Sequence, residues 1–385
     1  MEDKIKNNLK TAILLGSFAF GIMSFILPIY SKRIGADAVS IGGLFSVFSV
    51  VTLLLRPLIG KGIDKYGGKK FLTSSFLFYA ISMVLYSYSA NIILLYLSRV
   101  IQGIGSSLMW VSAYSMAVEN TENENRGGSI GKIDEASSRG ALYGAVIGFI
   151  VLSNFSFLSG WSLLFKGYAV LSILAAFIVY KYIPETKTTN KEKQEKGDTK
   201  LAGSFFKLLA VVFISSISAS MLNPLILIYL QDKFTKDLTV LAIAYIPTAL
   251  VYSFLPSKLG KISDKIGRII PMIIGLAGSG IDSFGFVYSS SIKVLVVFWV
   301  IESLGMVMAS PAQEALVADL TGEDVRGTGY GLYLFVTSLG AAIGPLLGGY
   351  LYEYFGHTIP FFLNGIILLL DMILVIILFK NSKKV

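Results

Sequence analysis

The chain has 385 residues, of which 54% are hydrophobic and 15% are charged. A water-soluble domain of this length cannot bury so large an apolar fraction, whereas lipid solvates it. The absence of cysteine excludes disulfides and thiol catalysis, and a single histidine, His357, argues against a histidine metal cluster. We therefore expect a membrane protein with no metal or cofactor, no nucleic-acid partner despite its net charge of +9, and no enzymatic activity.

Apolar runs of about 20 residues are long enough to span a bilayer as helices. Twelve such runs follow one another, at 11–30, 39–59, 70–89, 92–118, 128–152, 162–183, 204–230, 239–259, 269–289, 293–318, 327–351 and 359–379. Lysine and arginine are concentrated in the loops that lie on the same side as both termini, which predicts cytoplasmic termini. The sequence thus predicts an all-α polytopic protein of twelve transmembrane helices in the plasma membrane.

The only long polar stretch, residues 184–203, has the composition of a solvated linker. It separates a predicted N-terminal six-helix bundle, 1–183, from a predicted C-terminal six-helix bundle, 204–385. The two halves repeat, because Asp64, Gly67 and Arg126 each have an identical residue 200 positions later. Duplicated halves are a common architecture among transporters.

Two loops of the repeat share a motif. The loop after the second run reads Gly60-Lys-Gly-Ile-Asp-Lys-Tyr-Gly-Gly-Lys-Lys70, and the loop after the eighth reads Gly260-Lys-Ile-Ser-Asp-Lys-Ile-Gly-Arg268. Glycines permit a tight turn between closely packed helices, and an aspartate accepts hydrogen bonds from a helix N-terminus. The pattern resembles the G-x-x-x-D-[RK]-x-G-[RK]-[RK] loop of the major facilitator superfamily, although Gly68 occupies a usual basic position.

That resemblance implies two six-helix bundles that work by alternating access, with these loops as conformational latches. Acids at inner helix ends, followed by arginines, fit the same chemistry, although solvated helix ends would look alike. The predicted latch residues are Asp64, Lys65, Gly67, Glu119, Arg126, Asp264, Lys265, Gly267, Arg268, Asp319 and Arg326.

The fourth run contains Arg99 and resembles a second family motif, R-x-x-Q-G-x-G. A charge inside the bilayer costs about 2.5–3.5 kcal/mol, so Arg99 should face the protein interior. In the family such an arginine is tied to proton coupling or to anionic substrates; a structural pair with an acid is the alternative. Helical spacing and a break at Pro224 give the substrate-cavity candidates Arg99, Gln102, Ser106, Trp110 and Asn223.

Several acids lie inside predicted spans. Removal from water favours the neutral form of a carboxyl, so such a group can take up and release protons. Glu302 is the first candidate for a proton carrier, followed by Asp282 and Glu135, although each acid would serve equally well as a packed side chain. The full set of proton-coupling candidates is Glu302, Asp282, Glu135, Arg99, Arg139, Glu314 and Asp371.

A glycine pattern bears on the direction of transport. Many drug-proton antiporters of the family carry G-x-x-x-G-P-x-x-G-G in the fifth helix. Here that helix has Gly140, Gly144 and Gly148 without the proline, and the fuller pattern begins at Gly340 in the eleventh run. This departure weakens an assignment to export.

The sequence therefore predicts a monomeric secondary transporter that moves a small molecule across the lipid bilayer. Our first hypothesis is proton-coupled export of amphipathic or lipophilic molecules. The alternative is a proton symporter or facilitator for a sugar, organic acid or other metabolite. A membrane receptor or scaffold that transports nothing is a third hypothesis, which the paired latch motifs disfavour.

Overall fold

The computed structural model describes residues 2–118, 126–185, 203–255, 259 and 266–379, and every regular element in them is an α-helix. This confirms the predicted all-α polytopic fold. The reason is physical, because a helix satisfies its own backbone hydrogen bonds where no water is present.

Ten helices within the described ranges are long and apolar enough to cross a membrane. Ile5–Met23 and Phe25–Arg33, which meet at a bend of 52°, form one further span if they are counted together. Thr239–Tyr252 is a shorter apolar helix. The twelve predicted runs thus correspond to ten full spans, one bent pair and one short helix.

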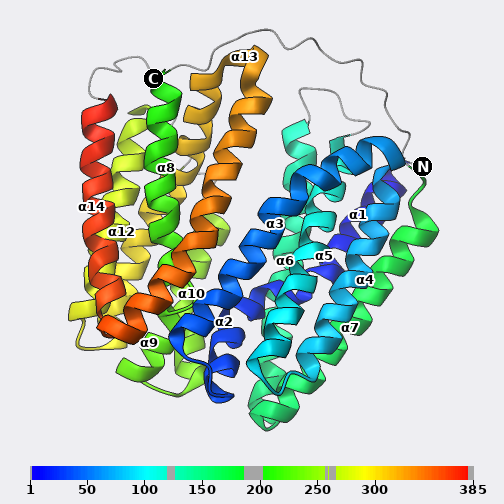
Figure 1. Ribbon diagram of the computed structural model, residues 1–385, viewed down its shortest axis with the longest axis horizontal. Coiled ribbons are helices and arrows are strands. Elements are labelled where there is room, and N and C mark those ends of the chain that lie inside the picture. The colour runs from blue at the N-terminus through cyan, green and yellow to red at the C-terminus, as the bar shows by residue number, and fades with distance from the viewer. Residues whose placement is uncertain (1, 119–125, 186–202, 256–258, 260–265, 380–385) are drawn as a thin grey trace. The chain divides into compact units, whose positions relative to one another are not determined.

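The chain divides into two compact units. The first comprises Met1–Ala36 and Val47–Glu192. Within it α4 lies against α5 and α7, and α6 lies against α1 and α2 (Figure 1). Its helices are α1 (Glu2–Gly16), α2 (Phe18–Arg33), α3 (Ala38–Tyr66), α4 (Gly68–Ser87), α5 (Ile92–Val118), α6 (Arg126–Asn154) and α7 (Phe157–Tyr182).

The second unit comprises Asp37–Ser46, which includes the first turns of α3, and Lys193–Val385. Most residues of the predicted linker 184–203 lie outside the described ranges. Its helices are α8 (Gly203–Leu222), α9 (Ile226–Lys233), α10 (Leu238–Phe254), α12 (Ile269–Tyr288), α13 (Ile292–Phe355) and α14 (Ile359–Phe379).

The predicted run 204–230 is two helices rather than one. Helix α8 ends at Leu222 and α9 begins at Ile226, with Pro224 in the break. Proline lacks the backbone N–H that a continuous helix needs and its ring clashes with the preceding turn. The break leaves the side chain of Asn223 exposed.

Helix α13 is assigned as one helical run of 64 residues, where two spans, 293–318 and 327–351, were predicted. Two contacts show that the chain turns back within it. A Cβ added to Gly329 would overlap the side chain of Thr321, and Gln313 donates a hydrogen bond of 3.0 Å to the Tyr333 hydroxyl, 20 residues away. The run therefore holds two spans, Ile292–Thr321 and Gly331–Phe355.

Local sequence signals explain where helices begin and end. Asp37 accepts a hydrogen bond of 2.7 Å from the Ser40 backbone N–H, and hydrogen bonds from Ser40 lower the pKa of Asp37. Such a side chain satisfies an orphan N–H at the start of α3. Gly67 and Gly267, which are equivalent in the repeat, have φ values of 83° and 85°, a conformation that glycine adopts without strain.

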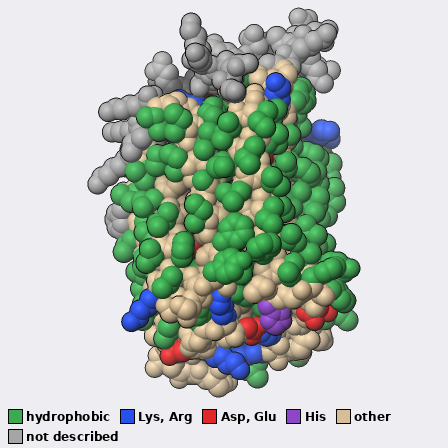
Figure 2. All heavy atoms as spheres, turned by 90° about the vertical axis from the view of Figure 1, so that its left-hand side faces the viewer, with side chains coloured by type: hydrophobic (Ala, Val, Ile, Leu, Met, Phe, Trp, Pro, Cys, Tyr) green, Lys and Arg blue, Asp and Glu red, His purple; other side chains and the backbone are tan. Residues whose placement is uncertain are grey.

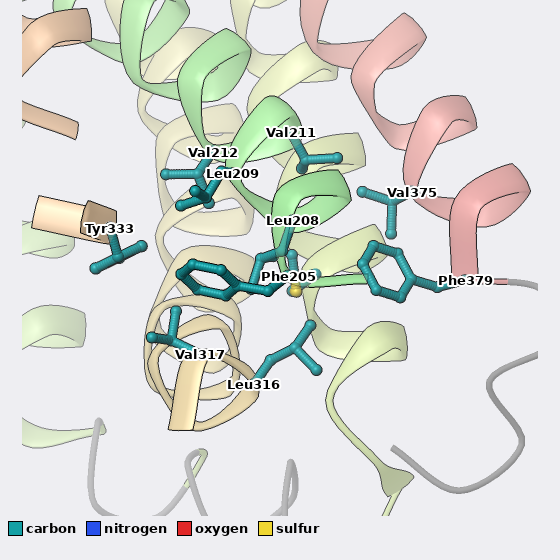
Figure 3. Close-up of a cluster of buried hydrophobic side chains, with 11 residues drawn as sticks. Phe205, Leu208, Leu209, Val211, Val212, Leu316, Val317, Tyr333, Val375 and Phe379 are labelled. Atoms are coloured by element: carbon teal, nitrogen blue, oxygen red, sulfur yellow. The ribbon is translucent and has the colours of Figure 1, made fainter. Parts of the chain in front are cut away.

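The cores of the units are built from apolar side chains. In the second unit Phe205 and Leu208 of α8 pack with Leu316 of α13 and with Val375 and Phe379 of α14 (Figure 3). The face that includes α14 is largely hydrophobic on its outside, and most of its charged side chains lie toward the ends of the helices (Figure 2). An apolar exterior with charges at the end is the pattern expected of a surface that contacts lipid.

Glycines allow helices in both units to touch through their backbones. In the first unit, Cβ atoms added to Gly140 and Gly144 of α6 would overlap the carbonyl oxygens of Leu14 and Phe18. In the second unit, Gly340 and Gly344 of α13, the equivalents of Gly140 and Gly144, lie against the backbone of α8 at Ile217 and Met221. Small residues are favoured at such interfaces because they let backbones approach closely. The repeat seen in the sequence is thus also a repeat of helix contacts.

We predict that Gly144→Ala destabilises the protein, because its added methyl group overlaps the Phe18 carbonyl and forces α6 away from α2. Overpacking of this kind costs about 1–3 kcal/mol. The matched control is Gly167→Ala in α7, where an added Cβ meets nothing within 4 Å. The control should leave stability unchanged or raise it by up to about 1 kcal/mol. Thermal unfolding in detergent measures both, and equal melting temperatures for the two variants would contradict the prediction.

Candidate functional site

Arg99 lies inside the first unit with 5% of its surface exposed. Its Nη1 donates a hydrogen bond of 2.9 Å to Oε1 of Gln102, one turn further along α5. The Tyr86 hydroxyl of α4 donates to the same oxygen at 2.9 Å, and the guanidinium lies 5.0 Å from the ring centre of Phe48. One amide oxygen and one ring face thus hold a buried cation in a fixed position.

The other cavity candidates of α5 continue this helix face. Ser106 is buried, and Trp110 is half-buried. Trp110 lies 6.5 Å from the ring of Phe20 and 5.3 Å from the ring of Tyr114. The Tyr114 hydroxyl donates a hydrogen bond of 2.6 Å to Asp134 of α6. Half-buried rings beside a carboxyl suit an amphipathic molecule better than a strongly hydrated one.

An acid pair lies in the second unit, at the contact between α12 and α13. Asp282 is 7% exposed, and its Oδ1 has no hydrogen-bond partner among the described residues. Oε1 of Glu302 accepts a hydrogen bond of 3.1 Å from Ser279, and the Asp282 and Glu302 carboxyls lie close enough to interact electrostatically. The helices approach closely here, since a Cβ added to Gly278 would lie 3.6 Å from Cα of Glu302.

A buried chain of polar groups leads to this pair. Ser218 of α8 donates a hydrogen bond to Oδ1 of Asn364 of α14, whose Nδ2 donates to the Ser283 hydroxyl at 2.8 Å. Ser283 in turn donates to the Ser279 carbonyl at 2.8 Å, and Ser279 holds Glu302. These hydrogen bonds connect α8, α14, α12 and α13 and hold the turn of α12 that carries Asp282.

A third acid of this unit, Asp371 of α14, is 1% exposed, and neither of its carboxyl oxygens has a hydrogen-bond partner among the described residues. A buried carboxylate without partners is unfavourable, so this group is expected to be neutral or neutralised. The remaining candidates are exposed. Glu135 and Arg139 form an ion pair with each other, and Glu314 and Asn223 have exposed side chains.

The structure joins some of the predicted latch residues. Arg268, which follows Gly267, lies with its Nε 3.5 Å from Oδ2 of Asp319 in α13. Glu119, Asp264 and Lys265 lie outside the described residues.

Sequence reasoning missed the residues that surround the main candidates, such as Ser279 and Tyr86. The repeat offered a signal for them. Gln102 and Glu302 are 200 positions apart, and so are Tyr86 and Phe286. At the position shared by Gln102 and Glu302, the N-terminal half has an amide that accepts from two donors, and the C-terminal half has a carboxyl. The side chains that donate to Gln102 are replaced by Trp299, which is uncharged and has a single N–H donor, and by Phe286, which has none.

The sequence model of the Major Facilitator Superfamily matches residues 11–210 and 208–385. The chain belongs to the Major Facilitator Superfamily. Proteins of this family are transporters rather than enzymes and bind small molecules within the membrane. The protein is therefore a multi-pass integral membrane transporter.

Individual relatives are distant. Multidrug resistance protein 2 of Bacillus subtilis (strain 168) is 22% identical over 374 residues, which cover 94% of this chain and 91% of the relative. The synaptic vesicular amine transporter of Mus musculus is 26% identical over 347 residues, which cover 88% of this chain and 66% of that transporter. The nucleoside transporter NupG has the same fold, with a TM-score of 0.79 at 16% identity over 99% of this chain and all of that one (100%).

We predict that Gln102→Leu destabilises the first unit more than Tyr86→Phe does. The leucine removes the acceptor that Arg99 and Tyr86 share, and buried donors that lose a partner cost about 1–3 kcal/mol each. The phenylalanine removes one donor and leaves the Arg99 contact in place, at a cost of about 1 kcal/mol. Thermal unfolding of the purified variants tests the order, and a Tyr86→Phe variant as unstable as Gln102→Leu would show that the amide is not the centre of the network.

Proposed function

We propose that this family member is a proton-coupled exporter of small amphipathic or lipophilic molecules in the plasma membrane. It works as a monomer by alternating access, with the predicted bundles 1–183 and 204–385 as the moving parts. A proton symporter or facilitator for a polar metabolite is the alternative that the experiment below separates from it.

The acid pair Asp282–Glu302 is the observation that carries the proposal. Two carboxyls that interact in surroundings with little water cannot both ionise without compensation. Among the described side chains, the basic residues of the surrounding helices stand near helix ends: Lys207 near the start of α8, Lys233 in the last turn of α9 and Lys293 in the first turn of α13. Protons are the simplest compensation, and a group that must bind a proton in one state can release it when water reaches it.

Two further observations support an amphipathic cargo. The half-buried rings of Trp110, Phe20 and Tyr114 offer an apolar, adaptable surface beside Asp134. One relative carries the name of a multidrug resistance protein and aligns over 94% of this chain. Arg99, which an anionic cargo would need, is already bonded to Gln102 and stacked on Phe48.

The latch role of the repeated loops rests on the ion pair between Arg268 and Asp319. An exposed pair of this kind contributes at most about 1 kcal/mol, so it breaks easily. A weak contact suits a latch, because a strong one would hold the transporter in a single state. The positive φ of Gly67 and Gly267 sets the tight turns that present the neighbouring basic residues.

We predict that Glu302→Gln abolishes proton movement coupled to cargo. The amide keeps the shape of the side chain but cannot carry a proton. The purified protein would be reconstituted in liposomes that enclose a pH-sensitive dye, and gradients of lipophilic cations, sugars and organic acids would be imposed in turn. The matched control is Glu185→Gln, an exposed acid after α7, which should leave coupling unchanged.

The outcomes separate the hypotheses. Proton movement opposite to a lipophilic compound, lost in Glu302→Gln and retained in the control, supports the proposal. Proton movement in the same direction as a sugar or an organic acid would replace export with symport. Normal proton movement in Glu302→Gln would remove Glu302 as the carrier.

A further inference from the structure

We propose that the Asp282–Glu302 pair also binds a small alkali metal cation, sodium or lithium, in place of a proton. The inference rests on the proposed coupling role of the same pair. It adds a second ligand to the site and a competition between that ligand and the proton.

Hard oxygen ligands lie on neighbouring turns of two helices that contact each other. The carboxyl of Asp282 and the hydroxyl of Ser279 come from α12, and the carboxyl of Glu302 comes from α13. Oδ1 of Asp282 is buried and has no hydrogen-bond partner within the described residues, so one oxygen of the pair is available to a ligand. Carboxylates and hydroxyls are oxygen donors of the kind that hard cations prefer.

The charge balance of the unit favours a cation. Between Ile269 and Tyr288, between Leu238 and Phe254 and between Ile359 and Phe379 the sequence has no basic residue. Glu302 lies nine residues after Lys293, about 13 Å along a helix. Within the described residues, the titratable or charged groups on the elements packed around the pair are Lys207 of α8, Tyr229, Asp232 and Lys233 of α9, Tyr245 and Tyr252 of α10, Tyr288 of α12, Lys293, Glu314, Asp319, Tyr333, Tyr350, Tyr352, Glu353 and Tyr354 of α13 and Asp371 of α14. Lys233, in the last turn of α9, donates hydrogen bonds of 2.6 and 2.7 Å to the Phe286 and Val287 carbonyls at the end of α12.

Of these groups, Tyr252 lies within electrostatic range of both acids, and it is neutral when protonated. Asp371 adds a carboxyl rather than a cation to the same unit. Among the described residues, the interior of this unit thus contains several acids, and the bases stand near helix ends. A bound cation supplies the missing positive charge in the way that a proton does, but without forming a covalent bond.

The size and number of ligands indicate a monovalent ion. Calcium takes about 6–8 oxygen ligands, and magnesium keeps several waters. The two carboxyls and the Ser279 hydroxyl are fewer, and α12 lies beside the backbone of α13 at Gly278, one turn from Asp282. One sodium or lithium ion together with one proton neutralises two carboxyls, whereas the larger potassium ion would push the helices apart.

The test measures proton displacement by the metal alone, without a membrane gradient. The full-length protein in detergent, at pH 7 in weak buffer with a pH-sensitive dye, would receive sodium, lithium or potassium chloride, or choline chloride at equal ionic strength. We expect sodium and lithium to release about one proton per protein, because metal binding requires deprotonated ligands. Potassium and choline should release none.

Three variants locate the effect. Asp282→Asn and Glu302→Gln should lose the sodium-dependent release, and Asp371→Asn, which changes another buried acid, should retain it. Sodium should also raise the melting temperature of the wild-type protein and of Asp371→Asn, but not that of the other two variants. Each variant's elution profile and melting curve in choline show that it is folded.

Sodium that acts like choline in both measurements would overturn the proposal, and so would a sodium effect that persists in Asp282→Asn and Glu302→Gln. These failures differ from failure of the proposed function. Loss of coupled transport in Glu302→Gln without any sodium effect would leave the proton carrier in place and remove only the metal. A sodium effect at the pair, together with normal coupled transport in Glu302→Gln, would keep the metal site and remove Glu302 as the proton carrier.

Discussion

The absence of water inside a bilayer is the constraint on which the rest of this structure depends. Every backbone N–H and C=O group in that layer must find a partner within the protein, which permits helices and excludes open strands. Hydrophobic burial then gives little help in holding helices together, because lipid is as apolar as the helices themselves. Stability must come from close packing and from hydrogen bonds between helices.

The two units meet this requirement in the same way. Gly140 and Gly144 of α6 bring its backbone onto α1 and α2, and Gly344 and Gly348 of α13 do the same with α8. Polar contacts then fix the pairs: Ser137 bonds to Ser17 in the first unit, and Ser220 bonds to the Gly340 carbonyl in the second. The duplication has therefore preserved a packing solution together with its sequence motif.

The same constraint makes the differences between the halves informative. A polar side chain inside a span is costly, so it persists where it has a partner or a task. Arg99 has partners, since Gln102 and Phe48 hold it. Within the described part of the chain, Asp282 and Asp371 retain carboxyl oxygens without hydrogen bonds. The first unit therefore holds a fixed positive charge, and the second holds negative charges that must be neutralised. An exchangeable cation, whether a proton or a metal, belongs chemically with the second.

The sequence by itself determined the class of the protein. Composition and the length of the apolar runs show that lipid surrounds the helices, and the repeated motif at Gly67 and Gly267 shows that the chain is duplicated. It also selected Glu302 and Asp282, since an acid inside an apolar run stands out in one dimension. Only the tertiary structure decided which polar groups meet. Ser279 reaches Glu302, and Asn364 reaches both Ser218 and Ser283, across helices far apart in the chain. Helical periodicity gives the face of a residue but not the neighbour that the face will contact, because helix rotation and crossing are set by packing against other helices.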